Sequence, residues 1–279
     1  MQTIGAGGPR PATRLDGWSW AAIACVAALC WSGPAAADEG EAAPVDSPWE
    51  AAIGALDEFD TLHPLPSADG DVERLVLGDA QGFVHVYERR DEAYEEVWVS
   101  EFLEGAIGGI AVTDINDDGL DEIVAYSESG RLVFFDTADY GVLWSNPPNE
   151  YEQLTAMLVH NIDDDAQDEL VLCADGRLVV YDGRDQFEEW RSDQNNIEAT
   201  DILVADVDGD GADEIVLNDG FVFDARFLDM EWQSPESFGE RLGALDIDND
   251  DIPEIIGEFG GRYLRIFDID LRRMKPSRQ

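Results

Sequence analysis

Short apolar runs separated by polar turns recur along the chain from Trp49 onward. In one unit, the apolar run 110–112 leads into an acidic stretch, and the run 123–126 leaves it. A turn containing glycine follows, then the run 132–135, and then a fourth run that ends at Trp144. Runs of this kind, bounded by turn residues, are typical of β-strands. Each unit therefore predicts four strands joined by turns.

The unit repeats at a nearly constant spacing. Its acidic stretches begin 47, 45 and 40 residues apart, at Asp114, Asn161, Asp206 and Asp246. Tryptophans with the same period stand at Trp98, Trp144, Trp190 and Trp232. Four-stranded repeats of about 40–45 residues are the signature of β-propeller blades. Several runs are apolar throughout, which fits strands covered on both faces of their sheet.

The N-terminal part of this region holds one further, degenerate repeat. Residues 65–73 keep Asp69, Gly70 and Glu73 at the expected offsets but lack the first two acids. The last repeat ends soon after Phe267 without a tryptophan, so we expect the strand at Trp49 to complete it. The predicted fold is an all-β propeller of five four-stranded blades, in which the N-terminal strand closes the last blade and leaves no unpaired edge.

The acidic stretch has the composition of a cation-binding loop. In residues 206–214, Asp206, Asp208 and Asp210 occupy positions 1, 3 and 5, and Glu214 occupies position 9. Alternating carboxylates on a tight turn bring their oxygens together, and oxygen ligands at this spacing suit Ca²⁺. Gly211 at position 6 supplies the positive φ that such a turn requires. A backbone carbonyl at position 7 completes the predicted ligand set.

We define four loops by their first residues: the Asp114 loop (114–122), the Asn161 loop (161–169), the Asp206 loop (206–214) and the Asp246 loop (246–254). Positions 1, 3, 5, 7 and 9 of these loops are Asp114, Asn116, Asp118, Leu120 and Glu122; Asn161, Asp163, Asp165, Gln167 and Glu169; Asp206, Asp208, Asp210, Ala212 and Glu214; and Asp246, Asp248, Asp250, Ile252 and Glu254.

The loops differ in how well they match the pattern. We expect roughly two to four Ca²⁺ sites, with the strongest in the Asp206 loop and the Asp114 loop next. The Asp246 loop has Asp251 at the glycine position, which an aspartate in left-handed geometry can occupy. The Asn161 loop is expected to bind more weakly, because it lacks one charge and has Ala166 at position 6.

Two other interpretations of the loops fit the sequence less well. An EF-hand needs a glutamate at position 12 and flanking helices, whereas Ala125 and Leu217 stand there within apolar runs. Acid-rich turns can also cap hairpins without any metal. Four loops with acids at matching offsets favour a metal over simple hairpin turns.

The loops resemble the calcium loops of FG-GAP/VCBS repeats, which build the propellers of the integrin-α type. Phe238-Gly239 and Gly243-Ala244 precede the last loop and resemble the residues from which that family takes its name. The resemblance covers about residues 49–270 and implies that calcium ligands fall on the positions given above. Glutamate at position 9, where the family usually has aspartate, and five repeats instead of seven are departures. Residues 136–144 are also similar to the outer turn of quinoprotein-type blades, where tryptophan packs between blades, but we infer no quinone cofactor.

The net charge narrows the choice of partners. The chain has 62 acidic and 17 basic residues, and Lys275 is its single lysine. Such a surface repels nucleic acids and anionic membranes. It favours divalent cations, cationic partners or a high-salt environment, so a halophilic origin is an alternative explanation of the acids.

The first 37 residues predict an export signal. Arg10 and Arg14 precede the apolar stretch 18–31, and small residues at 35–37 suit a cleavage site. A retained anchor, or a lipid on Cys25 or Cys30, is an alternative. We expect a linker at 38–48, the repeat domain at 49–273 and a tail at 274–279. The mature protein would be periplasmic, cell-surface or extracellular, would have no membrane span, and would keep only a buried Cys173.

No arrangement of residues predicts a catalytic or cofactor-binding site. His63, His85 and His160 are the only histidines, and none has a nucleophile or second histidine at a catalytic spacing. We therefore expect structural histidines and a non-enzymatic, monomeric calcium-binding propeller that acts as a binding, adhesion or scaffold module for a protein or carbohydrate. The alternative is an exported enzyme or accessory subunit, acting on polysaccharide or resembling a quinoprotein, with the propeller as its scaffold.

Overall fold

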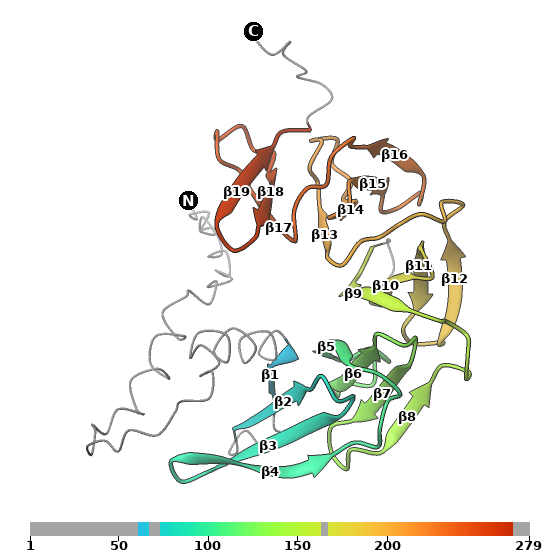
Figure 1. Ribbon diagram of the computed structural model, residues 1–279, viewed down its shortest axis with the longest axis vertical. Helices are drawn as coiled ribbons and strands as arrows, with labels where there is room; N and C mark the ends of the chain where they lie inside the picture. Colours follow the sequence, from blue (N-terminus) through green and yellow to red (C-terminus); the bar gives the residue numbers. More distant parts are fainter. Residues whose placement is uncertain (1–60, 67–72, 163–166, 270–279) are drawn as a thin grey trace, which may run out of the picture. The chain divides into compact units, whose positions relative to one another are not determined.

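The computed structural model describes residues 61–66, 73–162 and 167–269 (Figure 1). This part of the chain contains nineteen β-strands and no α-helix, which confirms the all-β prediction. Within it, no helix is long and apolar enough to cross a membrane. The predicted export signal, linker and C-terminal tail, together with Trp49, lie outside the described residues.

The strands form five antiparallel sheets, each built from strands that are consecutive in the chain (Figure 1). Sheet 1 contains β1 (His63–Leu65), β2 (Arg74–Gly78), β3 (Val84–Arg90) and β4 (Ala93–Val99); sheet 2 contains β5 (Ile107–Thr113), β6 (Glu122–Ser127), β7 (Leu132–Asp136) and β8 (Val142–Ser145); sheet 3 contains β9 (Leu154–His160), β10 (Glu169–Ala174), β11 (Arg177–Asp182) and β12 (Phe187–Arg191); sheet 4 contains β13 (Ile202–Ala205), β14 (Glu214–Leu217), β15 (Phe221–Asp224) and β16 (Met230–Gln233); sheet 5 contains β17 (Arg241–Leu245), β18 (Glu254–Phe259) and β19 (Tyr263–Phe267).

The strand predictions are confirmed at the level of each repeat. The apolar runs on either side of the Asp114 loop are β5 and β6, and the run that ends at Trp144 is β8. The second strands of the three middle sheets, β6, β10 and β14, are buried along their whole length, whereas β2 and β18 are buried only in part. The fourth strands are mostly exposed, and β12 alternates between exposed and half-buried residues. Continuous apolar runs therefore mark strands covered on both faces, whereas alternation marks the outer strands.

The hydrophobic core lies between sheets that follow one another in the chain. The first strands make contact in chain order: β1 with β5, β5 with β9, β9 with β13, and β13 with β17. Four buried clusters fill the junctions between sheets 1 and 2, 2 and 3, 3 and 4, and 4 and 5. Cys173 belongs to one of them and is buried, as predicted.

The tryptophans of the fourth strands pack against the next sheet, which confirms the packing role predicted for them. Each ring lies beside an aromatic residue near the end of the third strand of the following sheet. The centroid distances are 5.2 Å for Trp98 and Phe135, 5.5 Å for Trp144 and Tyr181, and 6.2 Å for Trp190 and Phe223. In sheet 4, Trp232 contacts Phe238, and Phe238 in turn contacts Phe267 of β19.

The two end sheets differ from the other three. Sheet 5 has three strands among the described residues, and its third strand exposes Tyr263, Leu264 and Ile266. In sheet 1, Leu65 belongs to β1, so the degenerate loop begins within a strand and most of it lies outside the described residues. Glu73, at position 9 of that loop, is exposed and pairs with Arg89 at 2.6 Å.

Candidate metal centre

The four acidic loops occupy equivalent places in sheets 2 to 5. Each loop connects the first strand of its sheet to the second strand, as the sequence predicts. Position 1 directly follows the first strand, and position 9 is the first residue of the second strand. The strands therefore hold both ends of each loop a short distance apart, because the two strands are adjacent and antiparallel.

The Asp206 loop brings its four predicted acids together. Carboxylate oxygens of Asp206, Asp208, Asp210 and Glu214 all lie within 4.8 Å of one another. Backbone N–H groups orient the three aspartates: Gly211 N–H donates to Asp206 at 3.0 Å, Asp210 N–H donates to Asp208 at 2.9 Å, and Ala212 N–H donates to Asp210 at 2.9 Å. The result is a compact set of oxygen donors of the kind that binds Ca²⁺.

The Asp246 loop assembles its carboxylates equally closely. Oxygens of Asp246, Asp248, Asp250 and Glu254 lie within 4.8 Å of one another. Asp251 has a φ of 72°, which confirms the left-handed geometry predicted for it. By the spacing of its carboxylates, the Asp246 loop equals the Asp206 loop. The sequence had ranked it below the Asp114 loop.

The Asp114 loop is organised differently, although its backbone makes similar contacts. Gly119 N–H donates to Asp114 at 2.8 Å, and Leu120 N–H donates to Asp118 at 2.9 Å. Among the described residues, carboxylate oxygens gather within 4.8 Å of one another in the Asp206 and Asp246 loops, but the three acids of the Asp114 loop do not form such a group. Asn116, at position 3, holds its Oδ1 atom buried and without a hydrogen-bond partner. A buried amide oxygen of this kind lacks the partner that a bound cation would supply.

The Asn161 loop is described only at its two ends. Asp163 and Asp165 lie outside the described residues, so their predicted ligand role stays a prediction. At the ends, Ile162 N–H donates to Glu169 at 2.9 Å.

The glutamate at position 9 has a structural role that the sequence reasoning missed. In every loop its carboxylate accepts a hydrogen bond from the backbone N–H of position 2, at 2.8–3.1 Å. These glutamates are among the few buried acids, with exposed fractions of 3% for Glu122, 5% for Glu169, 1% for Glu214 and 8% for Glu254. The longer side chain of glutamate reaches across the loop, and this contact gives a physical reason for the departure from the aspartate of the resembling family.

Position 4 adopts left-handed backbone geometry as well as position 6. At position 6, Gly119 and Gly211 have φ values of 90° and 92°, as predicted. At position 4, Asp117, Gly209 and Asn249 have φ values of 58°, 75° and 62°. Asp, Asn and Gly tolerate this region best, so the residue types at position 4 carried a signal that could have been read in advance.

Without a cation, the Asp114 and Asp206 loops disfavour the ionised form of their position 9 glutamates, Glu122 and Glu214. Burial, together with the charges of Asp118 and Asp114, raises the pKa of Glu122 to about 7. Burial raises the pKa of Glu214 to about 8, and the charges of Asp208, Glu231 and Asp206 add to the effect. A divalent cation would reverse this balance, because an opposite charge favours the ionised carboxylate.

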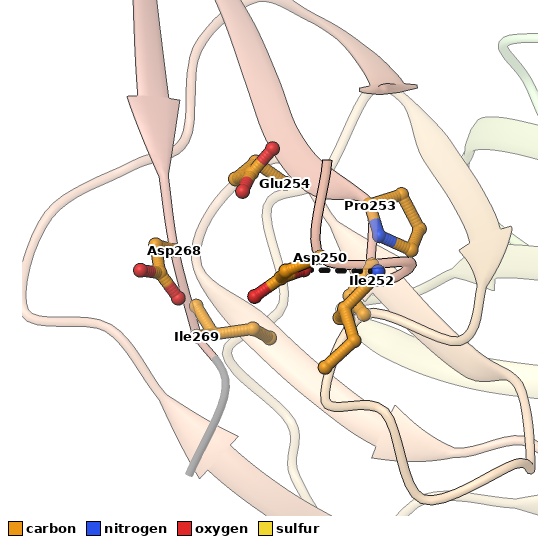
Figure 2. Close-up of a pocket in the computed structure, with 7 residues that line it drawn as sticks. Asp250, Ile252, Pro253, Glu254, Asp268 and Ile269 are labelled. Atoms are coloured by element: carbon orange, nitrogen blue, oxygen red, sulfur yellow. Dashed lines mark hydrogen bonds between the residues drawn. The ribbon is translucent and has the colours of Figure 1, made fainter. Parts of the chain in front are cut away.

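A small recess lies beside the Asp246 loop, at the junction with sheet 4. Figure 2 shows the carboxylates of Asp250, Glu254 and Asp268 around it, together with Ile252 and Ile269. Val207, at position 2 of the Asp206 loop, forms part of the same wall. The recess has no interior room for a water-sized sphere, so it does not suit an organic substrate. Sequence reasoning missed Asp268, which comes close to the loop only through the pairing of β18 with β19.

The histidines occupy structural settings in sheets 1 and 3. His85, on β3, contacts both Asp79 and Glu96. Burial lowers the pKa of His63, which lies on β1. His160 is the last residue of β9 and pairs with Glu169 across the sheet.

Comparisons with known proteins support the fold without identifying a family. No protein-family model and no curated protein sequence matches the chain. Among solved structures, the chain is similar to the biofilm matrix protein Bap1 of V. cholerae, with a TM-score of 0.52 and 20% identity over 70% of the chain. It is also similar to Sqt1 of Saccharomyces cerevisiae, with a TM-score of 0.54 and 11% identity over 74% of the chain. The aligned region spans 34% of the Bap1 structure and 59% of the Sqt1 structure.

Proposed function

We propose that the protein is an exported calcium-binding β-propeller of FG-GAP/VCBS type, which serves as a non-catalytic binding or scaffold module. The observation that carries the proposal is the placement of four acidic loops in register, two of which gather four carboxylates within 4.8 Å. A cation-binding loop repeated at the same corner of successive sheets is a feature of the architecture as a whole. It therefore supports a structural role for the cation.

The donor set suits calcium. Each complete loop offers only carboxylate, amide and carbonyl oxygens, which hard cations such as Ca²⁺ prefer over transition metals. Asp206, Asp208, Asp210 and Glu214 would hold one ion, and Asp246, Asp248, Asp250 and Glu254 would hold another. The buried Oδ1 of Asn116 supports a third, weaker ion in the Asp114 loop. When bound, the ion supplies positive charge that offsets the repulsion between these groups.

Such an ion would stabilise the junction between two sheets as well as its own loop. Position 2 in three loops is a buried apolar residue, with exposed fractions of 2% for Ile115, 7% for Ile162 and 1% for Val207. Its side chain packs in the core against the following sheet. Its backbone N–H is held by the position 9 glutamate. Fixing the loop therefore fixes the apolar residue that packs between the sheets.

The same proposal includes closure of the fold by the segment around Trp49. Sheet 5 lacks a fourth strand among the described residues, and β19 exposes Tyr263, Leu264 and Ile266. Each tryptophan of strands β4, β8 and β12 packs on the aromatic residue near the end of the next sheet's third strand, and in sheet 1 that place belongs to half-buried Tyr87. A strand containing Trp49 would supply both missing partners. It would also cover an edge that otherwise invites aggregation.

A binding or scaffold role agrees with what the described part of the chain contains. The recess at the Asp246 loop does not suit an organic substrate, and His85 contacts two carboxylates of its own sheet. The likeness to a biofilm matrix protein fits an extracellular setting, although an identity of 20% supports the fold alone. The partner would be a protein or a carbohydrate, recognised by surfaces other than the metal loops.

Calcium titration by calorimetry, combined with thermal unfolding, tests the proposal. At low ionic strength we expect two to four binding events and a rise in Tm, because each site at a hundredfold excess over its Kd adds about 2.7 kcal/mol. NaCl at matched ionic strength serves as the control for a merely halophilic surface. A Tm that follows NaCl equally well and ignores calcium and chelator would contradict the proposal.

A further inference from the structure

One histidine of sheet 1 is held between two carboxylates. The Nε2 atom of His85 lies 3.0 Å from Oδ2 of Asp79, and its Nδ1 atom lies 2.9 Å from Oε2 of Glu96. The side chains of His85 and Asp79 are each 17% exposed, whereas that of Glu96 is 47% exposed. The three residues come from β3, from the turn after β2, and from β4.

The geometry selects one protonation state of the imidazole. An ionised carboxylate has no proton to donate, so it acts only as a hydrogen-bond acceptor. A neutral imidazole carries a single N–H group. Both contacts of His85 can therefore be hydrogen bonds only when both ring nitrogens are protonated. In the neutral form, one carboxylate would face the lone pair of a ring nitrogen.

The residue that His85 holds also connects two sheets. The Oδ1 atom of Asp79 accepts hydrogen bonds from the N–H groups of Gln81 and Phe83, at 3.0 and 2.8 Å. The carbonyl oxygen of Asp79 accepts a hydrogen bond from Ile107 N–H at 3.0 Å. Ile107 is the first residue of β5, so the turn that carries Asp79 joins sheet 1 to sheet 2. The Phe83 ring contacts Phe102, in the connection between β4 and β5, at 5.8 Å between centroids.

We propose that His85 is a pH-sensitive clamp, which locks the junction between sheets 1 and 2 when its imidazole is protonated and loosens it when the proton is lost. The side-chain contact with Asp79 transmits the change, because Asp79 holds β5 through its main chain. The contact with Glu96 ties the outer strand β4 to the same event.

The groups around His85 define the pH range of the clamp. Asp79 faces it from the β2–β3 turn, Glu96 faces it from β4, and the ring of Tyr87 stacks on it from β3 at 6.2 Å. Burial lowers the pKa of His85, but the hydrogen bonds and charges of Asp79 and Glu96 raise it further, so it lies above its ordinary value. Burial raises the pKa of Asp79, but backbone and His85 contacts lower it by more.

The directions of the two pKa shifts define the pH range in which both His85 and Asp79 are charged. The contribution of His85 is complete below the unfolded pKa of about 6.5 and is lost as the pH rises through the folded pKa. The contribution of Asp79 is complete above the unfolded pKa of about 3.9 and is lost as the pH falls through the folded pKa. The clamp is therefore closed below about pH 6.5 and opens as the pH rises through the raised pKa of His85.

Amide hydrogen exchange of the full chain tests the clamp at one bond. The readout is the protection factor of Ile107 N–H from mildly acidic to alkaline pH, corrected for the intrinsic pH dependence of exchange. Leu154 N–H is the matched control, because it is the first residue of β9 and donates to Glu128 after β6 in the same way, at 3.2 Å. We expect Ile107 protection to fall roughly tenfold for each pH unit by which the pKa of His85 is raised, while Leu154 protection stays constant.

Two variants separate the clamp from a general loss of stability. His85→Gln should abolish the pH step at Ile107 and leave Leu154 unchanged. Glu96→Gln keeps a side chain of the same size on an exposed site and can donate to a neutral imidazole, so it should move the step to lower pH. An NMR titration that places His85 at or below about 6.5, or a step that persists in His85→Gln, would overturn the proposal.

Discussion

The position 9 glutamate is both a proposed ligand and a structural residue. Its carboxylate accepts the N–H of position 2 in all four loops, and its burial raises the pKa of Glu122 and Glu214 in the absence of a cation. Among the other acids of the Asp206 loop, Asp210 is the exposed one, whereas Asp206 and Asp208 are less exposed. Loss of Asp210 therefore tests metal binding with less damage to the fold.

At the residue scale, the variant Asp210→Ala should lower the affinity of the Asp206 loop for calcium at least tenfold, or about 1.4 kcal/mol. The reason is the loss of one of four clustered carboxylates. The matched control is Asp213→Ala, which removes the same charge from an exposed residue of the same loop that does not belong to the cluster. Calorimetric titration measures both. Equal losses in the two variants would mean that net charge, and not a defined site, attracts the ion.

At the element scale, the tryptophan of each fourth strand joins its sheet to the next. Trp190 on β12 packs against Phe223 of β15, and it also contacts the buried cluster between sheets 3 and 4. Phe187 lies on the same strand but is 48% exposed. The two aromatic residues therefore offer a comparison between one that packs against the next sheet and one that is exposed on the same strand.

The variant Trp190→Ala should destabilise the protein by about 2 kcal/mol or more, because it removes a partly buried aromatic side chain and leaves a cavity. Phe187→Ala, as its control, should cost much less. Urea unfolding at a fixed calcium concentration gives both values. A cost for Phe187→Ala that matches that of Trp190→Ala would argue against the tryptophan as the contact that joins the sheets.

On the scale of the whole molecule, the proposed closure depends on a single aromatic residue. If the segment around Trp49 completes sheet 5, then Trp49→Ala should lower the Tm as Trp190→Ala does. Glu50→Ala is the neighbouring control and should leave the Tm almost unchanged. Thermal unfolding of the two full-length variants decides the point, and an unaltered Tm in Trp49→Ala would argue for an open array of sheets.

The buried glutamates of the loops make the stability of the whole molecule depend on both pH and calcium. The pKa values of about 7 for Glu122 and about 8 for Glu214 lie above the unfolded value, so these groups favour the folded state at low pH. Their contribution is lost as the pH rises through these values. The chelated protein should therefore show a Tm that falls between about pH 4.3, the unfolded pKa of glutamate, and about pH 8, the higher of the two folded values. Saturating calcium should remove most of this fall, since the ion binds the ionised carboxylates.

His85 provides the control for this dependence. Its clamp also weakens with rising pH, and its partners Asp79 and Glu96 lie outside the four proposed calcium loops, so His85→Gln should remove a part of the fall that calcium leaves in place. If calcium fails to change the slope of Tm against pH, the position 9 glutamates are not ligands.

Local pattern was sufficient to predict the repeats, the strands and the loop positions. Burial of a strand between two sheets requires an apolar run, and a cation loop requires acids at fixed short offsets, so both can be read within one segment. The left-handed residues at position 4 belong to this class too, since Asp117, Gly209 and Asn249 are types that tolerate positive φ.

Contacts between distant segments could not be read in this way. The carboxylates around His85 come from residues 79 and 96, and Asp268 reaches the Asp246 loop from the strand that pairs with β18. Such contacts depend on sheet register, which side-chain packing determines only when the whole sheet forms. The sequence by itself determined the repeat, its strands and its acidic loops. The tertiary structure decided which side chains meet, because register and packing between sheets act across the chain and not along it.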